Sequence, residues 1–298
     1  MKLNEAVTDL LDFAINPSSR YGTGFAIDTQ CGMVGKGELG LMWARSGSGK
    51  STWVLNVAAN TPEVPTAIVS MEMTPRRQAA WLTAMTQDLS FAARHIEDAI
   101  QLPDDDPRHI EVLKALTAVA PMYPDLSLEW MARPTVDELA MKIDALGEEG
   151  EKPERVFVDH MGLLSNCQDY QGYVDTAGQL HSWAVSENLA VIVLQQTGRG
   201  ATEASSNVRD RNNGHVPVTL NSGVFAGETD ADWVYGMYRP DRDPKFSAAD
   251  LGPLEIAEYE RVKGKVRLQV IKNRPLGDVC ERGIELVYNY KNMRLADA

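Results

Sequence analysis

Residues 41–56 read LMWARSGSGKSTWVLN, and this stretch determines how the rest of the chain is interpreted. A short apolar run is followed by two glycines and Lys-Ser-Thr, and a helical pattern begins at about Lys50. Gly47 and Gly49 let backbone amides approach an anion, and the start of a helix supplies unpaired N–H groups and a positive dipole end. The stretch therefore predicts a phosphate-binding loop between a strand and a helix.

The residues after the glycines assign contacts to a nucleoside triphosphate. Lys50 can reach its β- and γ-phosphates, and the hydroxyl of Ser51 can ligate Mg²⁺. Ala44 stands where the usual pattern begins with glycine, but this position only joins the strand to the loop and accepts alanine when φ is negative. We predict ATP and Mg²⁺ as ligands, rather than a glycine-serine turn that happens to precede Lys-Ser-Thr. The predicted phosphate site comprises Ala44, Arg45, Ser46, Gly47, Ser48, Gly49, Lys50, Ser51 and Thr52.

The composition is that of a globular protein with a buried core, since the 298 residues are 44% hydrophobic and 24% charged. No apolar run is long enough to cross a bilayer and the N-terminus lacks a secretory signal, so we expect a cytoplasmic protein with no membrane partner. Three scattered cysteines without a CxxC pair argue against a disulfide framework and a zinc site. The net charge of −13 argues against nucleic-acid binding by bulk electrostatics, so any such binding must use a local patch.

Apolar runs alternate with helical patterns along most of the chain, which is typical of a mostly parallel sheet with helices on both faces. Thr74-Pro75 is expected to start one helix, and Thr135 and Glu138 have capping-box spacing for another. A further helix is expected over about 176–188. The expected strands are 39–43, 66–70, 126–129, 155–159, 190–196 and 232–238, with 265–272 and 283–288 pairing as a hairpin.

Three polar residues follow expected strands. Asp159 closes RVFVD and can hold Mg²⁺ through water, together with Ser51. Glu72 lies just past the run 66–70 and can polarise an attacking water as a general base. Gln196 ends AVIVLQQ and can sense the γ-phosphate through its amide. The alternatives are a solvent-facing strand end for Asp159, an ordinary surface glutamate for Glu72 and a capping amide for Gln196.

Five short motifs now resemble a known family. ARSGSGKST, VSMEM, VFVDHMGLL, VLQQTGR and VIKNRPLG are similar, in order and approximate spacing, to ARPSMGKT, SLEM, IDYLQL, SQLNR and KQRNGPIG of the RecA-like motor domain of DnaB-type replicative helicases. Each motif is loose, but the ordered set is specific and extends from about Gly22 to Asn292. The resemblance implies an α/β fold with a RecA-like P-loop NTPase core, a mostly parallel central sheet with helices on both faces and a C-terminal antiparallel hairpin. Ala44 also fits this branch of P-loop proteins, which commonly begins the loop with Ala-Arg.

The resemblance assigns catalytic roles to the residues of the predicted site. It implies that Lys50 and Ser51 hold phosphate and Mg²⁺. It makes Glu72 the catalytic base, Asp159 the acid on the Mg²⁺ side and Gln196 the γ-phosphate sensor.

Lys272 and Arg274 match the basic pair that, in the family, enters the neighbouring subunit's site. Arg274 would be an arginine finger, a role that requires a planar and permanently charged guanidinium. The resemblance thus implies a homo-oligomer, namely a hexameric ring with ATP at the subunit interfaces. From the residues alone, a hairpin edge protected by charges is the preferred interpretation.

We divide the chain into an N-terminal amphipathic helix or linker, residues 1–20, and one RecA-like ATPase domain, residues 21–298. The apolar face of residues 3–15 is expected to dock on the adjacent subunit or to fold back on its own domain. DnaB-type helicases carry a separate N-terminal domain that contacts primase, and this length leaves no room for one. That departure suggests a phage-like or stand-alone version, with the host cytoplasm as its location.

Other departures concern the acid motif and the DNA contacts. His160 replaces the tyrosine that is common after the Walker acid, and the finger motif is altered around Arg274. The expected loops for single-stranded DNA are 165–177, which has no basic residue, and 199–222. The alternative for the second is a solvated flexible loop. The predicted phosphate contacts to DNA are Arg199, Arg209 and Arg211.

Three functions remain open. The first is a DnaB-like ATPase motor, a DNA helicase or translocase in replication that acts on single-stranded DNA. The second is a RecA-like recombination or strand-annealing ATPase, and the third is a RecA-like regulatory ATPase with protein partners and no DNA role. The acidic charge and the acidic first loop favour the third.

Overall fold

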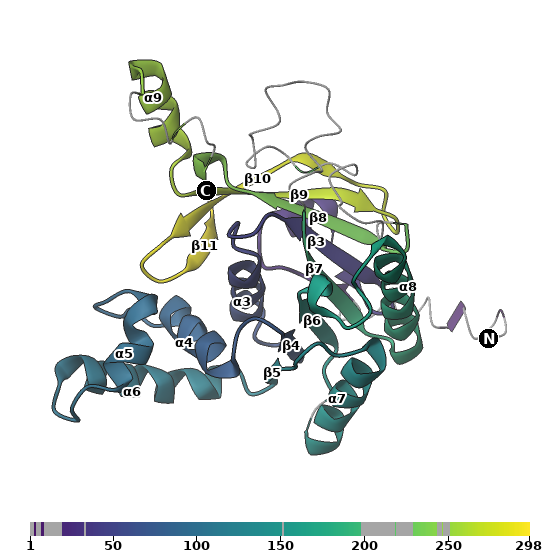
Figure 1. Ribbon diagram of the computed structural model, residues 1–298, viewed down its shortest axis with the longest axis horizontal. Helices are drawn as coiled ribbons and strands as arrows, with labels where there is room; N and C mark the ends of the chain where they lie inside the picture. The colour runs from purple at the N-terminus through teal and green to yellow at the C-terminus, as the bar shows by residue number, and fades with distance from the viewer. Residues whose placement is uncertain are drawn as a thin grey trace.

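The protein is organised around one large β-sheet, seen in a computed structural model that describes residues 3, 7, 8, 20–32, 34–150, 152–197, 218, 229–242, 246 and 251–298. Within these residues, nine strands form the sheet in the order β11-β10-β9-β8-β3-β7-β6-β4-β5 (Figure 1). The strands from β8 to β5 run parallel, and β9, β10 and β11 extend one edge in antiparallel fashion. The predicted α/β fold, with a mostly parallel sheet and a C-terminal antiparallel hairpin, is confirmed.

The expected strands of this sheet are observed to within a few residues. The sheet consists of β3 Leu39–Ala44, β4 Thr66–Ser70, β5 Leu126–Trp130, β6 Arg155–Asp159, β7 Ala190–Gln196, β8 Trp233–Tyr238, β9 Lys265–Asn273, β10 Cys280–Asn289 and β11 Arg294–Asp297, and β1 Arg20–Tyr21 pairs separately with β2 Val34–Gly35. The described α-helices are α2 Ile27–Cys31, α3 Lys50–Asn60, α4 Pro75–Thr86, α5 Ile96–Ile100, α6 Pro107–Val119, α7 Val136–Glu149, α8 Tyr170–Glu187 and α9 Pro253–Val262.

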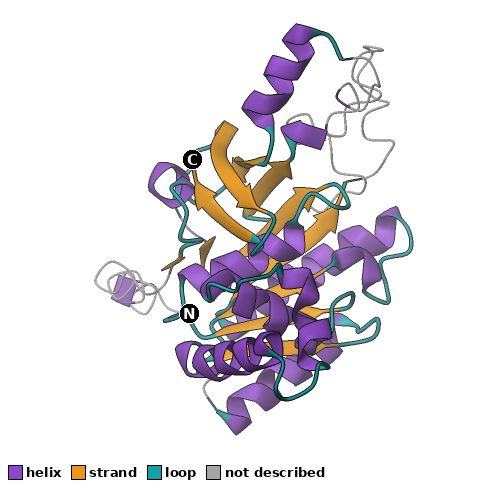
Figure 2. Cartoon of the chain, turned by 90° about the vertical axis from the view of Figure 1, so that its left-hand side faces the viewer, coloured by secondary structure: helices purple, strands orange, loops and turns teal. Residues whose placement is uncertain are grey.

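Helices cover both faces of the sheet, because the central strands are apolar on both sides. On β3, Met42 and Ala44 belong to the core beneath α3, whereas Leu41 and Trp43 belong to the core beneath α7 and α8. Figure 2 shows helices packed over the strands. This arrangement fixes β3, and the loop that follows it, between two packed layers.

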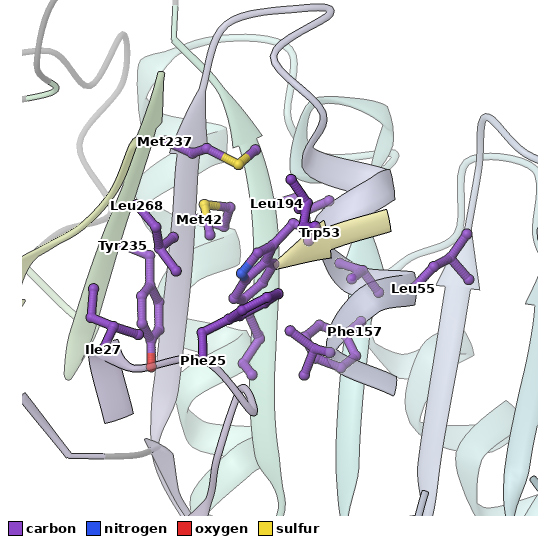
Figure 3. Packing of buried hydrophobic residues seen from close by; sticks show 14 of the residues in the cluster. Phe25, Ile27, Met42, Trp53, Leu55, Phe157, Leu194, Tyr235, Met237 and Leu268 are labelled. Atoms are coloured by element: carbon purple, nitrogen blue, oxygen red, sulfur yellow. The ribbon is translucent and has the colours of Figure 1, made fainter. Parts of the chain in front are cut away.

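Trp53 anchors the helix that begins the site. Its fully buried ring lies 6.0 Å from Phe157 in an edge-to-face arrangement and 5.7 Å from Tyr235 (Figure 3). Replacing a buried aromatic side chain of this size by alanine costs about 3–5 kcal/mol. The packing therefore holds α3, and with it the residues at the start of α3, against β6 and β8.

The C-terminal hairpin lies against the same helix. Asn56 on α3 is fully buried and donates from Nδ2 to the carbonyl of Met293 at 3.0 Å, while its Oδ1 accepts from the N–H of Leu295 at 2.9 Å. These two bonds join the turn and strand β11 to α3. Met293 and Leu295 thereby line the cavity beside the start of α3.

The helix caps that the sequence predicted are present. Thr74 caps α4, whose first residue is Pro75, and Thr135 forms a reciprocal capping box with Glu138 at the start of α7.

The elements α5, α6, α9 and β11 were not predicted. The amphipathic helix expected over residues 3–15 falls almost entirely outside the described residues. Among the helices that the structure does describe, none is both long and apolar enough to cross a membrane.

Candidate nucleotide site

The loop between β3 and α3 has the backbone geometry that its glycines predict. Gly47 and Gly49 have φ of +74° and +100°, in the left-handed region that favours glycine. Ala44 ends β3 and does not have a positive φ, which agrees with the role expected for it. The amides at the start of α3 are therefore available to an anion in front of the loop.

Lys50 lies under this loop and is almost fully buried. Its ammonium donates to the carbonyls of Ala44 at 3.1 Å and Arg45 at 3.2 Å. Burial lowers the pKa of Lys50 to about 8, although Asp159 and Glu72 act in the opposite direction. A phosphate beside this amine would further stabilise its charged form, as expected for a residue that binds phosphate.

Ser51 and Asp159 form a pair that suits Mg²⁺. The Ser51 hydroxyl donates to Oδ2 of Asp159 at 2.6 Å, whereas the buried Oδ1 of Asp159 has no hydrogen-bond partner. Burial raises the pKa of this carboxyl group. No group of three or more His, Cys, Asp and Glu side chains in the described residues could hold a metal by itself. The pair therefore fits a hard cation held by few protein oxygens and completed by phosphates and water.

Glu72, Gln196 and His160 meet beside this pair. Glu72 follows β4 in a turn where the Ser70 hydroxyl accepts from two amides, those of Glu72 and Met73. Nε2 of His160 lies 3.2 Å from Oε1 of Glu72 and 3.2 Å from Nε2 of Gln196. Burial lowers the pKa of His160, while Glu72 and Asp159 raise it. Glu72 and Gln196 thus lie at the same end of the sheet as the loop, as predicted, and both line the same cavity.

The cavity has a volume of about 420 Å³ and a second wall that the sequence analysis missed. Arg239, at the end of β8, places its guanidinium over the rings of Tyr288 at 5.3 Å and Tyr290 at 5.0 Å. Asp241 accepts from this guanidinium at 2.7 Å and holds it in place. Such stacked aromatic and guanidinium groups are suited to a flat heterocycle such as a nucleobase.

Arg242 connects this wall to the phosphate-binding loop, since its Nη1 donates to the carbonyl of Gly47 at 2.6 Å. A Cβ atom at Gly47 would lie 2.8 Å from that nitrogen, so a larger residue there would displace the Arg242 side chain. The clustered aromatic and arginine residues at the ends of β8 and β10 were a usable signal. From its hydrophobic pattern, that segment is predicted only to form strands.

Lys272 and Arg274 lie at the opposite end of the sheet from the loop. Strand β9 runs antiparallel to β8, so Asn273 pairs with Trp233 at the start of β8. The N–H of Arg274 donates to the carbonyl of Asp232, and the N–H of Asp232 donates to that of Leu39, the first residue of β3. The five-residue step from Leu39 to Ala44 spans about 16 Å at ~3.3 Å per residue. The side chain of Arg274 pairs with Asp232 at 3.3 Å and does not contribute to the loop of its own chain.

The loops expected to contact DNA are only partly described. Within 165–177, helix α8 begins at Tyr170, so the expectation of a loop through 177 and of a helix start near 176 was wrong. The Asp169 side chain caps α8 by accepting from the N–H of Gly172 at 2.8 Å, which explains the earlier start. The expected contacts Arg199, Arg209 and Arg211 lie outside the described residues.

The strand that ends in Gln196 lies between the strand that leads into the loop and the strand that ends in Asp159. A parallel sheet with this order and a glycine-rich loop after β3 defines a RecA-like P-loop nucleotide-binding domain. The chain belongs to the family of the DnaB-like helicase C terminal domain, whose model matches residues 22–296. The resemblance deduced from the five motifs is confirmed.

Two of the solved structures that share the fold illustrate the likeness. The ATPase domain of G40P is similar with a TM-score of 0.77 and 18% identity, covering 100% of this chain and 99% of that one. A structure of a DnaB-like replicative helicase and its interactions with primase is similar with a TM-score of 0.74 and 17% identity, covering 100% of this chain and 68% of that one. No curated protein matches the chain in sequence.

Proposed function

We propose that the protein is an ATP-hydrolysing DnaB-like motor that acts on single-stranded DNA, as a helicase or translocase in replication. The observation that carries this proposal is the convergence of Lys50, the Ser51–Asp159 pair, Glu72 and Gln196 around one cavity in a chain of this family. When bound, Mg²⁺ would neutralise phosphate charge beside Ser51 and the free Oδ1 of Asp159.

The residues of this site divide the work of hydrolysis. Lys50 and the loop amides bind the phosphates, Glu72 accepts the proton of the attacking water, and Gln196 contacts the γ-phosphate. The wall of Arg239, Tyr288 and Tyr290 receives the base, which sets the nucleotide's orientation before the reaction.

The position of Arg274 supports an ATP site shared between subunits. Its main chain lies about 16 Å along the sheet from Ala44, beyond the reach of an arginine side chain, at ~3.3 Å per strand residue. A neighbouring copy must therefore supply any guanidinium that this position contributes to catalysis. A hexameric ring, with each subunit completing its neighbour's site, fits this requirement.

The test measures ATP turnover with and without single-stranded DNA, together with strand displacement from a forked duplex. Stimulation by DNA and displacement support the motor, and Lys50→Ala should abolish both. Stimulation without displacement would instead indicate the recombination or annealing ATPase. ATP turnover that is indifferent to DNA, together with no salt-sensitive DNA binding, would contradict both DNA functions. That result would favour the regulatory ATPase, which the net charge of −13 also suits.

A further inference from the structure

His160 is buried at the centre of the candidate site, yet none of the roles described so far uses it. Only 10% of its side chain is exposed, and its ring lies between the residue proposed as base and the residue proposed as γ-phosphate sensor. The family commonly has a tyrosine at this position, so the arrangement belongs to the residues of this chain.

The hydrogen bonds of the ring determine which nitrogen carries the proton. The N–H of Gly162 donates to Nδ1 of His160 at 3.1 Å, so Nδ1 is an acceptor and the neutral ring is protonated on Nε2. A Cβ at Gly162 would lie 2.6 Å from the Tyr173 hydroxyl and 3.1 Å from Cε1 of His160, so glycine leaves room for this turn beside the ring. The main chain of the turn after β6 therefore fixes the tautomer.

One Nε2–H then faces two neighbours. Oε1 of Glu72 and the amide of Gln196 both lie 3.2 Å away. The amide can accept from this proton only through its oxygen, and turning the amide by 180° places that oxygen in the position of the nitrogen. A single proton is thus shared between the carboxylate of Glu72 and the amide of Gln196.

We propose that His160 is a positioning residue that couples Gln196 to Glu72 through this shared proton. The inference rests on the proposed ATP hydrolysis. When the Gln196 side chain moves away from His160 to donate to a γ-phosphate, the Nε2–H is left to Glu72 alone. The carboxylate is then held in one orientation only when the nucleotide carries a γ-phosphate, so recognition of the phosphate and alignment of the base occur together.

Two substitutions separate the hydrogen bond from the packing. His160→Gln keeps a donor at the distance of Nε2, whereas His160→Phe keeps the ring and removes the donor. We expect His160→Phe to lower kcat at least about tenfold, a part of the 10²–10⁴ that a general base contributes, with KM changed less than about threefold. His160→Gln should remain within about threefold of the wild type in kcat. His109→Phe replaces another buried histidine, whose ring nitrogens lie 3.0 Å from the carbonyl of Ile100 and 3.6 Å from Asp104, and it should leave kcat unchanged because His109 does not line the cavity.

Two further measurements distinguish positioning from a general loss of structure. The first measures single-turnover hydrolysis of labelled ATP in a Glu72→Gln background. There His160→Phe should lower the rate less than about twofold further, because the rate losses from two residues that act through the same carboxylate are not additive. Nitrogen-15 NMR of the five histidines should show His160, assigned with the Gln variant, protonated on Nε2. Its resonance should shift with a non-hydrolysable ATP analogue but not with ADP, and Gln196→Ala should remove that difference.

The inference is overturned by an unchanged kcat in His160→Phe, by additive losses in the double variant, or by an Nδ1-protonated ring. A weaker affinity for ADP in His160→Phe would assign the residue to folding of the site and would likewise overturn it. A wild-type protein without ATP turnover would instead refute the proposed function, which keeps the two failures distinguishable.

Discussion

Asn56 gives the most direct test of how the C-terminal hairpin completes the nucleotide site. Its amide bonds to the main chain of Met293 and Leu295, which joins α3 to the turn and strand that follow Tyr288 and Tyr290. We expect Asn56→Ala to destabilise the protein and also to displace the aromatic wall of the cavity.

The size of the effect follows from the groups left behind. Removing the side chain leaves the buried N–H of Leu295 and the partly buried C=O of Met293 without these partners, at about 1–3 kcal/mol each, so we expect a loss of about 4 kcal/mol. The matched control is Asn60→Ala, one turn later on α3. Asn60 is partly exposed and accepts from the Arg294 side chain at 2.5 Å, a group that water can solvate instead. Its loss should be about 1 kcal/mol.

Urea unfolding followed by circular dichroism measures both variants. With an m-value of about 3 kcal/mol per molar, the midpoint should fall by a little over 1 M for Asn56→Ala and about 0.3 M for Asn60→Ala. Binding separates the second effect, because Asn56→Ala should weaken ATP but leave the affinity for inorganic tripolyphosphate unchanged. Equal midpoints for the two variants, or equal losses of ATP and tripolyphosphate affinity, would refute this account of the hairpin.

Three further substitutions test the site and its assembly. Arg274→Ala should leave nucleotide binding intact and abolish ATP turnover. Mixing it with a Glu72→Ala chain under subunit exchange should restore some active interfaces. A mixture that is as inactive as either variant alone argues against a shared site. Asp159→Asn should raise the Mg²⁺ concentration needed for half-maximal turnover at least about tenfold, since a charge-assisted contact contributes about 1.5–3 kcal/mol, and a Mg²⁺ titration that overlays the wild type rules this assignment out. Tyr290→Ala, which removes a half-exposed ring from the cavity wall, should raise KM for ATP about fivefold, since stacking on a base contributes ~1–3 kcal/mol. An unchanged KM would place the base elsewhere.

The phosphate-binding loop was predictable because neighbouring residues of the sequence encode it. A glycine-rich loop, the strand before it and the helix after it are adjacent in the chain, and their chemistry depends on backbone conformation that glycine permits. Asp159 and Gln196 were found because the ends of buried parallel strands meet at one edge of a sheet. Their roles were assigned only through the resemblance to the family.

The missed parts arise from elements far apart in the sequence. Arg239 meets Tyr288 and Tyr290 only because β8 and β10 lie two strands apart in the sheet and both end near the loop. His160 was noted as a departure from the family, but its contacts depend on two separate strand ends that no local pattern specifies. The start of α8 at Tyr170 was missed because a capping aspartate extended the helix into the expected loop.

The antiparallel course of β9 gives the subunit two unlike ends. The loop stands at one end of the sheet and Arg274 at the other, so assembly that brings them together is head-to-tail. In such a chain of n copies an open string contains n − 1 complete sites, whereas a closed ring contains n. One terminal subunit of every open assembly therefore has an ATP site that no neighbour completes. ATP turnover per subunit should therefore rise with protein concentration and reach its maximum only when the ring closes.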